Sequence, residues 1–145
     1  MTPTIRYLAD TSTLVRLPHD AVAEVLASLL SAGELATCGV IELALLSLIQ
    51  SPAEYAEIKA MRAASFQWLP TTDQDFHRAL AVQALLAEEE CRAIAWPQLV
   101  VAAVAERHGV SLLHYNPVFE QIAKLTGQAA EWVAAAGSLE LDEPP

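Results

Sequence analysis

An α/β fold, in which a central parallel β-sheet is flanked by helices on both faces, is predicted from the order of apolar segments along the chain. Short, largely apolar stretches alternate with longer ones whose apolar residues recur at helical spacing. Strands and helices that alternate in this way form parallel sheets covered on both sides. With 145 residues, of which 54% are hydrophobic, the chain has the size and apolar content of one compact domain.

Five short strands account for the apolar stretches, and turn or capping residues follow several of them. The first strand ends at the polar triplet Asp10-Thr11-Ser12, which is typical of a helix cap, and the third ends at Pro70. The predicted strands are 5–9, 35–38, 66–69, 110–114 and 131–135.

Six helices are predicted between and after these strands, from apolar spacing and from residues that start or stop a helix. Gly33 ends the first helix, Pro52 opens the third, and Thr71-Thr72-Asp73 caps the fourth. The fifth is strongly apolar, follows Pro97 and ends at His108-Gly109. The predicted helices are 22–30, 40–49, 52–64, 73–89, 99–107 and 117–125.

The domain boundary and the location of the protein follow from composition. Residues 1–137 are predicted to form the domain, and 138–145 an acidic tail that we expect to be disordered. No apolar run approaches the roughly 18 residues that a membrane span needs, and the first ten residues lack a signal-peptide pattern. We therefore expect a cytoplasmic protein without a membrane segment.

Charge and cysteine content narrow the classes of function. The net charge of −10 does not favour nucleic acid as a partner, because binding to phosphates normally relies on basic side chains. It suits a basic protein partner or divalent cations instead. Cys38 and Cys91 belong to no metal-binding motif, so we expect reduced, buried thiols.

A candidate site lies where two predicted strands end. Ligands of open α/β sheets sit beyond the carboxyl ends of the strands. Asp10 follows the strand 5–9, and Asn116 follows the strand 110–114. We therefore expect both side chains at the same edge of the sheet.

Several segments along the chain resemble the VapC-type PIN domains, the toxins of bacterial type II toxin–antitoxin pairs. Residues 7–12 are similar to the family's strand-end pattern LxDTS, and residues 99–109 to its helix DLLIAAxAxxHG. Residues 112–123 resemble the segment LLHYDxDFExIA, and Glu131-Trp132-Val133 resembles the end of mycobacterial members. The likeness extends to Gly137 and implies a PIN-like fold.

The resemblance also implies an activity and partners. Family members are endoribonucleases in which four or five carboxylates hold Mg²⁺ or Mn²⁺, and the metal activates a water for in-line attack on RNA. A homodimer and a VapB-like antitoxin are the partners that the family suggests. No serine-protease-like triad, phosphate-binding glycine loop or zinc pattern indicates another chemistry.

Asp10 matches the first acid of the family, and its other interpretation is an N-cap. Thr11 and Ser12 match hydroxyls that face the site, although they could serve only as a cap.

Glu42 is the candidate second acid, but alignment from Cys38 places Ala44 at the family position. Two residues along a helix correspond to a rotation of about 200°, so Glu42 is either a metal ligand or merely an acid in the first helical turn.

The remaining family acids are replaced by neutral residues. Gln98 stands at the start of the helix where the family has Asp, and Asn116 stands in place of the Asp of HYD. Asn116 either ligates a metal through its carbonyl or caps the helix after Pro117. Val118 replaces a further Asp, so the acidic site is degenerate.

Two functions follow from this pattern. One is a Mg²⁺- or Mn²⁺-dependent endoribonuclease toxin, with activity reduced or lost because most of its carboxylates are replaced. The other is a catalytically inactive PIN-fold module that dimerises and binds an antitoxin or another protein. Whether the protein is an enzyme is left open by the sequence.

Overall fold

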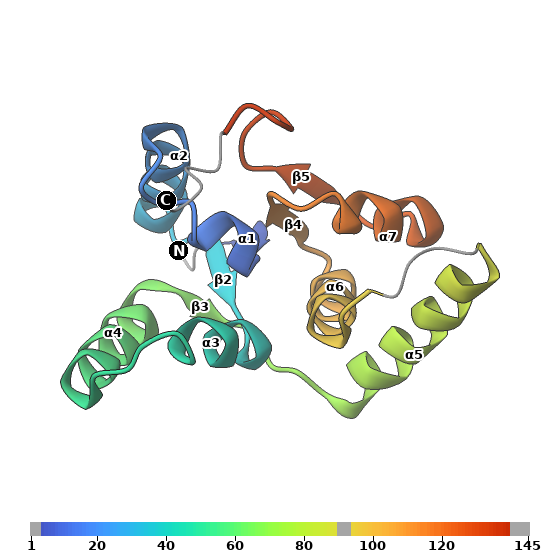
Figure 1. The fold of residues 1–145 in the computed structure, drawn as a ribbon, viewed down its shortest axis with the longest axis horizontal. Helices are drawn as coiled ribbons and strands as arrows, with labels where there is room; N and C mark the ends of the chain where they lie inside the picture. Colours follow the sequence, from blue (N-terminus) through green and yellow to red (C-terminus); the bar gives the residue numbers. More distant parts are fainter. Residues whose placement is uncertain (1–3, 90–93, 140–145) are drawn as a thin grey trace.

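The computed structural model describes residues 4–89 and 94–139, and within them it shows the predicted α/β fold (Figure 1). Five parallel strands form one sheet in the order β3-β2-β1-β4-β5. The strands are β1 (Tyr7–Ala9), β2 (Leu35–Thr37), β3 (Gln67–Trp68), β4 (Ser111–His114) and β5 (Ala130–Trp132).

Helices cover both faces of this sheet, as predicted. In Figure 1, α2 lies on one face, whereas α6 lies on the other with α5 and α7 beside it. The described helices are α1 (Thr11–Leu14), α2 (Asp20–Ser31), α3 (Gly39–Leu46), α4 (Pro52–Ser65), α5 (Asp73–Glu88), α6 (Trp96–His108) and α7 (Val118–Thr126). None of them is long and apolar enough to cross a membrane.

Most element bounds differ by one to three residues from the predicted ones, and three of the differences have a clear physical reason. The triplet after β1 is not only a cap but begins a short helix, α1. Helix α3 ends at Leu46 instead of continuing to 49, because the N–H groups of Leu48 and Ile49 bond to carbonyls three residues back and tighten the chain into a turn. Strand β5 ends at Trp132 instead of Ala135, since its partner β4 ends at His114, directly opposite.

The apolar core lies between the sheet and its helices. Leu8, Leu112 and Phe119 are fully buried in it. Cys38 is also buried, as predicted, and burial raises the pKa of its thiol. Cys91 lies outside the described residues.

Ion pairs fasten α5 to α6 on the outer layer. Arg107 donates two hydrogen bonds to the carboxylate of Asp75, and Arg78 pairs with Glu106. Burial by itself raises the pKa of the Asp75 carboxyl, but the bonds from Arg107 and the Thr72 N–H outweigh it and hold the pKa below its usual value.

The first two residues of the predicted tail, 138 and 139, lie within the described part of the chain and make hydrogen bonds to the domain. Ser138 donates its N–H to the carbonyl of Ala135, and the N–H of Leu139 bonds to the hydroxyl of Tyr115 at 2.9 Å. Residues 140–145 lie outside the described residues.

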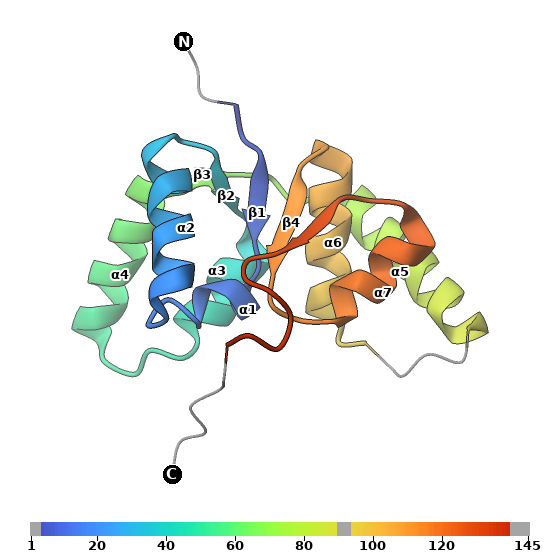
Figure 2. The ribbon, with the colours of Figure 1, turned by 90° about the horizontal axis from the view of Figure 1, so that it is seen from above.

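The carboxyl ends of the central strands meet the starts of three helices. β1 and β4 are neighbours in the sheet and run in the same direction. Figure 2 shows α1 and the starts of α6 and α7 at the end of the molecule where β1 and β4 finish. This edge is therefore where the predicted site residues can come together.

Candidate functional site

Asp10 is the first side chain beyond β1, and it is buried, with 4% exposed. Its Oδ2 accepts the N–H of Ser12 at 2.9 Å, so it is the N-cap of α1. Its own N–H bonds to the carbonyl of Leu113 at the end of β4. Asp10 therefore serves as a cap at the predicted edge of the sheet, with Oδ1 accepting no hydrogen bond from the described residues.

The hydroxyls that follow Asp10 join α1 to the end of β4. Ser12 Oγ accepts the N–H of Tyr115 at 2.9 Å, and Thr13 Oγ1 donates to the carbonyl of Leu113 at 2.8 Å. Thr11 is half-buried at the start of α1. The hydroxyl of Ser12 thus connects α1 to the turn that follows β4.

Asn116 lies in the turn that follows β4. Its Oδ1 accepts the N–H of Val118 at 3.0 Å in an Asx turn, whereas the N-cap of α7 is Pro117 and not Asn116. The N–H of Asn116 donates to Nδ1 of His114 at 3.1 Å. One lone pair of the amide oxygen is thus already used at the start of α7.

Gln98 lies in the first turn of α6, the helix whose start is at this end of the molecule (Figure 2). It is half-buried, and its N–H donates to the carbonyl of Ala95 at 3.1 Å. An amide at this place offers an oxygen but no negative charge.

Glu42 is directed toward α4. Its Oε1 and Oε2 accept hydrogen bonds from Nε and Nη2 of Arg62 at 2.8 and 2.9 Å, and Thr37 also donates to Oε2. The side chain of Arg62 is only 8% exposed and stacks on the ring of Phe66 at 4.3 Å. The carboxylate is therefore committed to a buried ion pair, an arrangement that sequence reasoning missed because nothing singled out Arg62.

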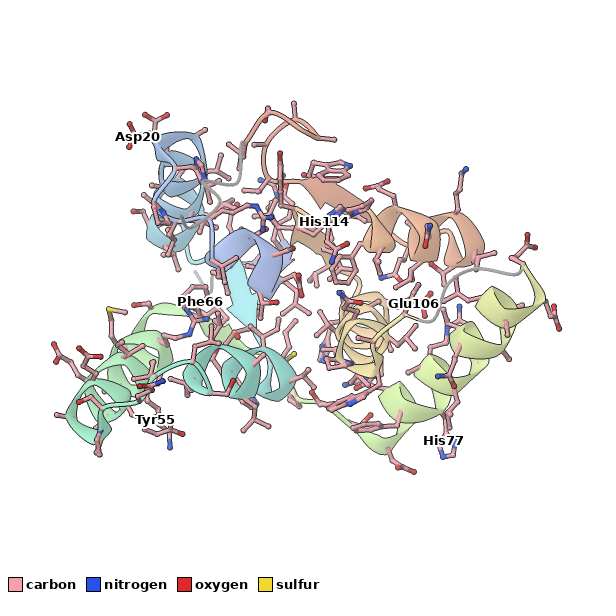
Figure 3. All side chains as sticks on the ribbon, viewed as in Figure 1. Asp20, Tyr55, Phe66, His77, Glu106 and His114 are labelled. Atoms are coloured by element: carbon pink, nitrogen blue, oxygen red, sulfur yellow. The ribbon has the colours of Figure 1, made fainter. Side chains whose placement is uncertain are left out.

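His114, the last residue of β4, combines a buried position with polar contacts (Figure 3). The side chain is fully buried between the rings of Phe119 and Trp132. Its Nε2 lies 2.9 Å from Oε1 of Glu120, while Nδ1 faces the N–H of Asn116. Burial lowers the pKa of this imidazole below its usual value, although Glu120 acts in the opposite direction.

The donors at this edge do not fit a PIN-type divalent metal centre. Mg²⁺ and Mn²⁺ bind mainly to charged oxygens. Here Asp10 is the buried carboxylate after β1, while the first turn of α6 and the turn after β4 carry the neutral amides Gln98 and Asn116. Within residues 4–89 and 94–139, no group of three or more His, Cys, Asp or Glu side chains could hold a metal ion. Glu90, which precedes α6, lies outside the described residues.

Comparison with known proteins agrees with this architecture. Residues 7–125 match the PIN domain family. The chain is 35% identical to Ribonuclease VapC21 of Mycobacterium tuberculosis, over 93% of this chain and 99% of that protein. It is 33% identical to Ribonuclease VapC51 of the same organism, over 94% of this chain and 98% of that protein.

Solved structures share the fold at low sequence identity. The chain superposes on VapBC2 from Rickettsia felis, bound to a DNA fragment from its promoter, with a TM-score of 0.73 and 14% identity over 88% of this chain and 98% of that one. It superposes on VapBC-5 of Mycobacterium tuberculosis with a TM-score of 0.58 and 24% identity, over 90% and 98% of the two chains.

The chain therefore belongs to the PIN-domain family. Within it, the chain belongs to the VapC ribonuclease group, since its likeness to VapC21 covers nearly the whole length of both proteins. The family expectation from the sequence is confirmed.

The buried ion pair should make Arg62 more important for stability than a surface arginine. Arg62→Met leaves the charge of Glu42 without a partner, so we expect a loss of about 3–5 kcal/mol in the free energy of unfolding, measured by urea denaturation. Arg78→Met, which breaks a more exposed pair, is the control and should cost about 1 kcal/mol or less. Adding Glu42→Gln to Arg62→Met should recover part of the loss. Equal losses for the two arginine variants would contradict this interpretation.

His114 should make the fold sensitive to mild acid. Unfolded, it binds a proton near pH 6.5, whereas the folded protein binds that proton only at lower pH. Below about pH 6.5 the unfolded state therefore holds more protons, and the free energy of unfolding falls as the pH decreases toward the folded pKa. Urea denaturation between about pH 7.5 and 5 should show a smaller decrease in His114→Asn than in wild type. His77→Asn, at a 75% exposed histidine, is the control, and no difference between the two variants would refute the assignment.

Proposed function

We propose that this VapC-type protein keeps the PIN fold and its binding surfaces, while cleavage of RNA is reduced or lost. The observation that carries the proposal is the direction of Glu42. The one acid that could have joined Asp10 from α3 is paired with Arg62 and Thr37 instead. Asp10 is then left with neutral partners from α6 and from the turn after β4.

The proposal rests on the charge that metal-dependent cleavage requires. PIN ribonucleases generally depend on divalent metal ions, which would position a water and neutralise charge on the phosphate. Gln98 and Asn116 preserve hydrogen-bonding capacity, but replacing carboxylates by amides removes the charge that attracts Mg²⁺ or Mn²⁺. Asp10 is the charged residue that we assign as ligand to a metal ion at this site.

Restoring the acids at the family positions should recover metal binding, because the backbone of the edge is intact. The variant carrying Ala44→Glu, Gln98→Asp and Asn116→Asp should bind Mn²⁺ roughly tenfold or more tightly than wild type in calorimetric titration. It should also gain Mn²⁺-dependent cleavage of single-stranded RNA. The same variant with Asp10→Asn is the control and should lose both gains. Efficient Asp10-dependent cleavage by the wild-type chain would overturn the proposal.

The second candidate function, an inactive binding module, is favoured by an apolar groove between α3, α4 and β3. The groove has a volume of about 370 Å³. Leu43 and Trp68 line it and are 72% and 58% exposed. The groove side of α4 contributes Tyr55 and Lys59, and no acid of α4 lines the groove. A segment with apolar side chains and an acidic residue beside Lys59 fits this surface, and we assign it to a VapB-like antitoxin, the partner present in the solved VapBC complexes.

A second apolar surface lies on α5 and α6 and suits a second copy of the chain. Phe76, Leu80 and Trp96 line a hollow of about 240 Å³ there and are 45%, 61% and 61% exposed. The neighbouring carboxylate of Glu106 is neutralised by Arg78, which limits repulsion between two acidic chains. We assign this surface to the homodimer that the family suggests.

Substitutions should separate the two surfaces. Leu80→Lys should convert a dimer to a monomer in light scattering, because it places a charge in the proposed apolar interface. Leu43→Lys should leave the dimer intact and weaken calorimetric binding of a VapB antitoxin, with the antitoxin chain of VapBC-5 as the probe. Leu48→Lys, at a 70% exposed residue that does not line the groove, is the control for both. A monomeric wild-type chain, or loss of the dimer in Leu43→Lys, would contradict the assignment.

A further inference from the structure

The turn that follows β4 is held by side chains at three of its backbone N–H groups. The N–H of Tyr115 donates to Ser12 Oγ at 2.9 Å, and that of Asn116 donates to His114 Nδ1 at 3.1 Å. The N–H of Val118 donates to Asn116 Oδ1 at 3.0 Å. Each bond depends on an acceptor atom of a named side chain, so Ser12, His114 and Asn116 help to hold the turn, together with backbone bonds such as that from Phe119 N–H to the carbonyl of Asn116.

One of these acceptors exists only in one form of the imidazole. A neutral histidine carries its proton on one ring nitrogen, and the other nitrogen accepts. Nδ1 of His114 can accept from Asn116 only when the proton is on Nε2. In the other tautomer, two N–H groups would face each other, and the bond to Asn116 would be lost.

The contact on the opposite side of the ring selects the same tautomer. Nε2 of His114 lies 2.9 Å from Oε1 of Glu120. An ionised carboxylate accepts hydrogen bonds and cannot donate them, so it requires the proton on Nε2. The ring is fully buried between Phe119 and Trp132, which holds its plane in line with both partners.

We infer that Glu120 is a positioning residue that fixes the tautomer of His114 and thereby the turn that carries Asn116. It accepts the Nε2 proton, and Nδ1 is then free for the N–H of Asn116. The same turn is attached to α1 through Ser12, two residues after Asp10. That these hydrogen bonds matter for a metal site rests on the proposed function. That Glu120 fixes the tautomer of His114 does not depend on it.

The inference is tested by removing the acceptor while leaving the core in place. The side chain of Glu120 is 44% exposed, so its substitution need not disturb packing. Long-range ¹H–¹⁵N spectra at about pH 8, where histidine is neutral, should show the Nε2–H tautomer of His114 in wild type. Glu120→Ala should shift part of the population to the Nδ1–H tautomer and speed amide exchange of Asn116 by about tenfold.

Two further variants separate positioning from general destabilisation. Glu120→Gln should shift the tautomer less than Glu120→Ala, because its side-chain carbonyl can still accept the Nε2 proton, although its NH₂ group can also donate. Gln121→Ala, at an exposed position of the same helix, should change neither measurement. An Nδ1–H tautomer in wild type, or unchanged tautomer and exchange in Glu120→Ala, would overturn the inference.

The link to the site is measured separately in the variant with restored acids. Adding Glu120→Ala to it should weaken Mn²⁺ binding by roughly tenfold, because the ligand at position 116 is then less well placed. If the restored variant binds no Mn²⁺, the proposed function fails, while the tautomer measurement still decides on the role of Glu120. If it binds Mn²⁺ and Glu120→Ala has no effect on affinity, the positioning role in the site is refuted.

Discussion

The parallel pairing of β1 with β4 is the constraint on which the rest of the structure depends. These strands lie at the centre of the sheet, and the bonds between them continue beyond their last residues. Asp10 donates its N–H to Leu113, and Thr13 and Ser12 then bind the backbone of β4 and of the turn after it. Asp10 and Asn116 are therefore held at one edge by hydrogen bonds within the protein.

The Glu42–Arg62 pair shows how one position along a helix decides between a structural and a chemical role. A carboxylate buried beside an arginine is stabilised by its bidentate bonds, and removing either charge leaves the other unpaired. From that position it cannot also supply charge to the neighbourhood of Asp10 without breaking the pair. The family acid belongs two residues later, at Ala44, where this chain has no polar group.

The sequence predicts the strands and helices of the fold better than it predicts the contacts of the candidate site. The strands and helices follow from apolar spacing and from start and stop residues such as Pro52 and Gly109, because those signals act locally. Gly109 adopts a left-handed conformation, with φ of 67°, where α6 ends. The end of β5 is set instead by the length of its neighbour, and the direction of Glu42 by an arginine 20 residues away. Such long-range partners leave no periodic signal in the sequence.

The site edge keeps its shape because neutral contacts hold it. In a metal centre, close carboxylates repel one another until a cation binds, so part of the order of the site comes from the metal. Here the turn is held by Ser12, by the Nε2–H tautomer of His114 and by the amide of Asn116, and none of these contacts requires an ion. Loss of the acids then removes charge without loosening the backbone. An edge built in this way can keep its shape without the charge that a divalent metal ion needs, and this is the structural condition on which the proposed loss of cleavage rests.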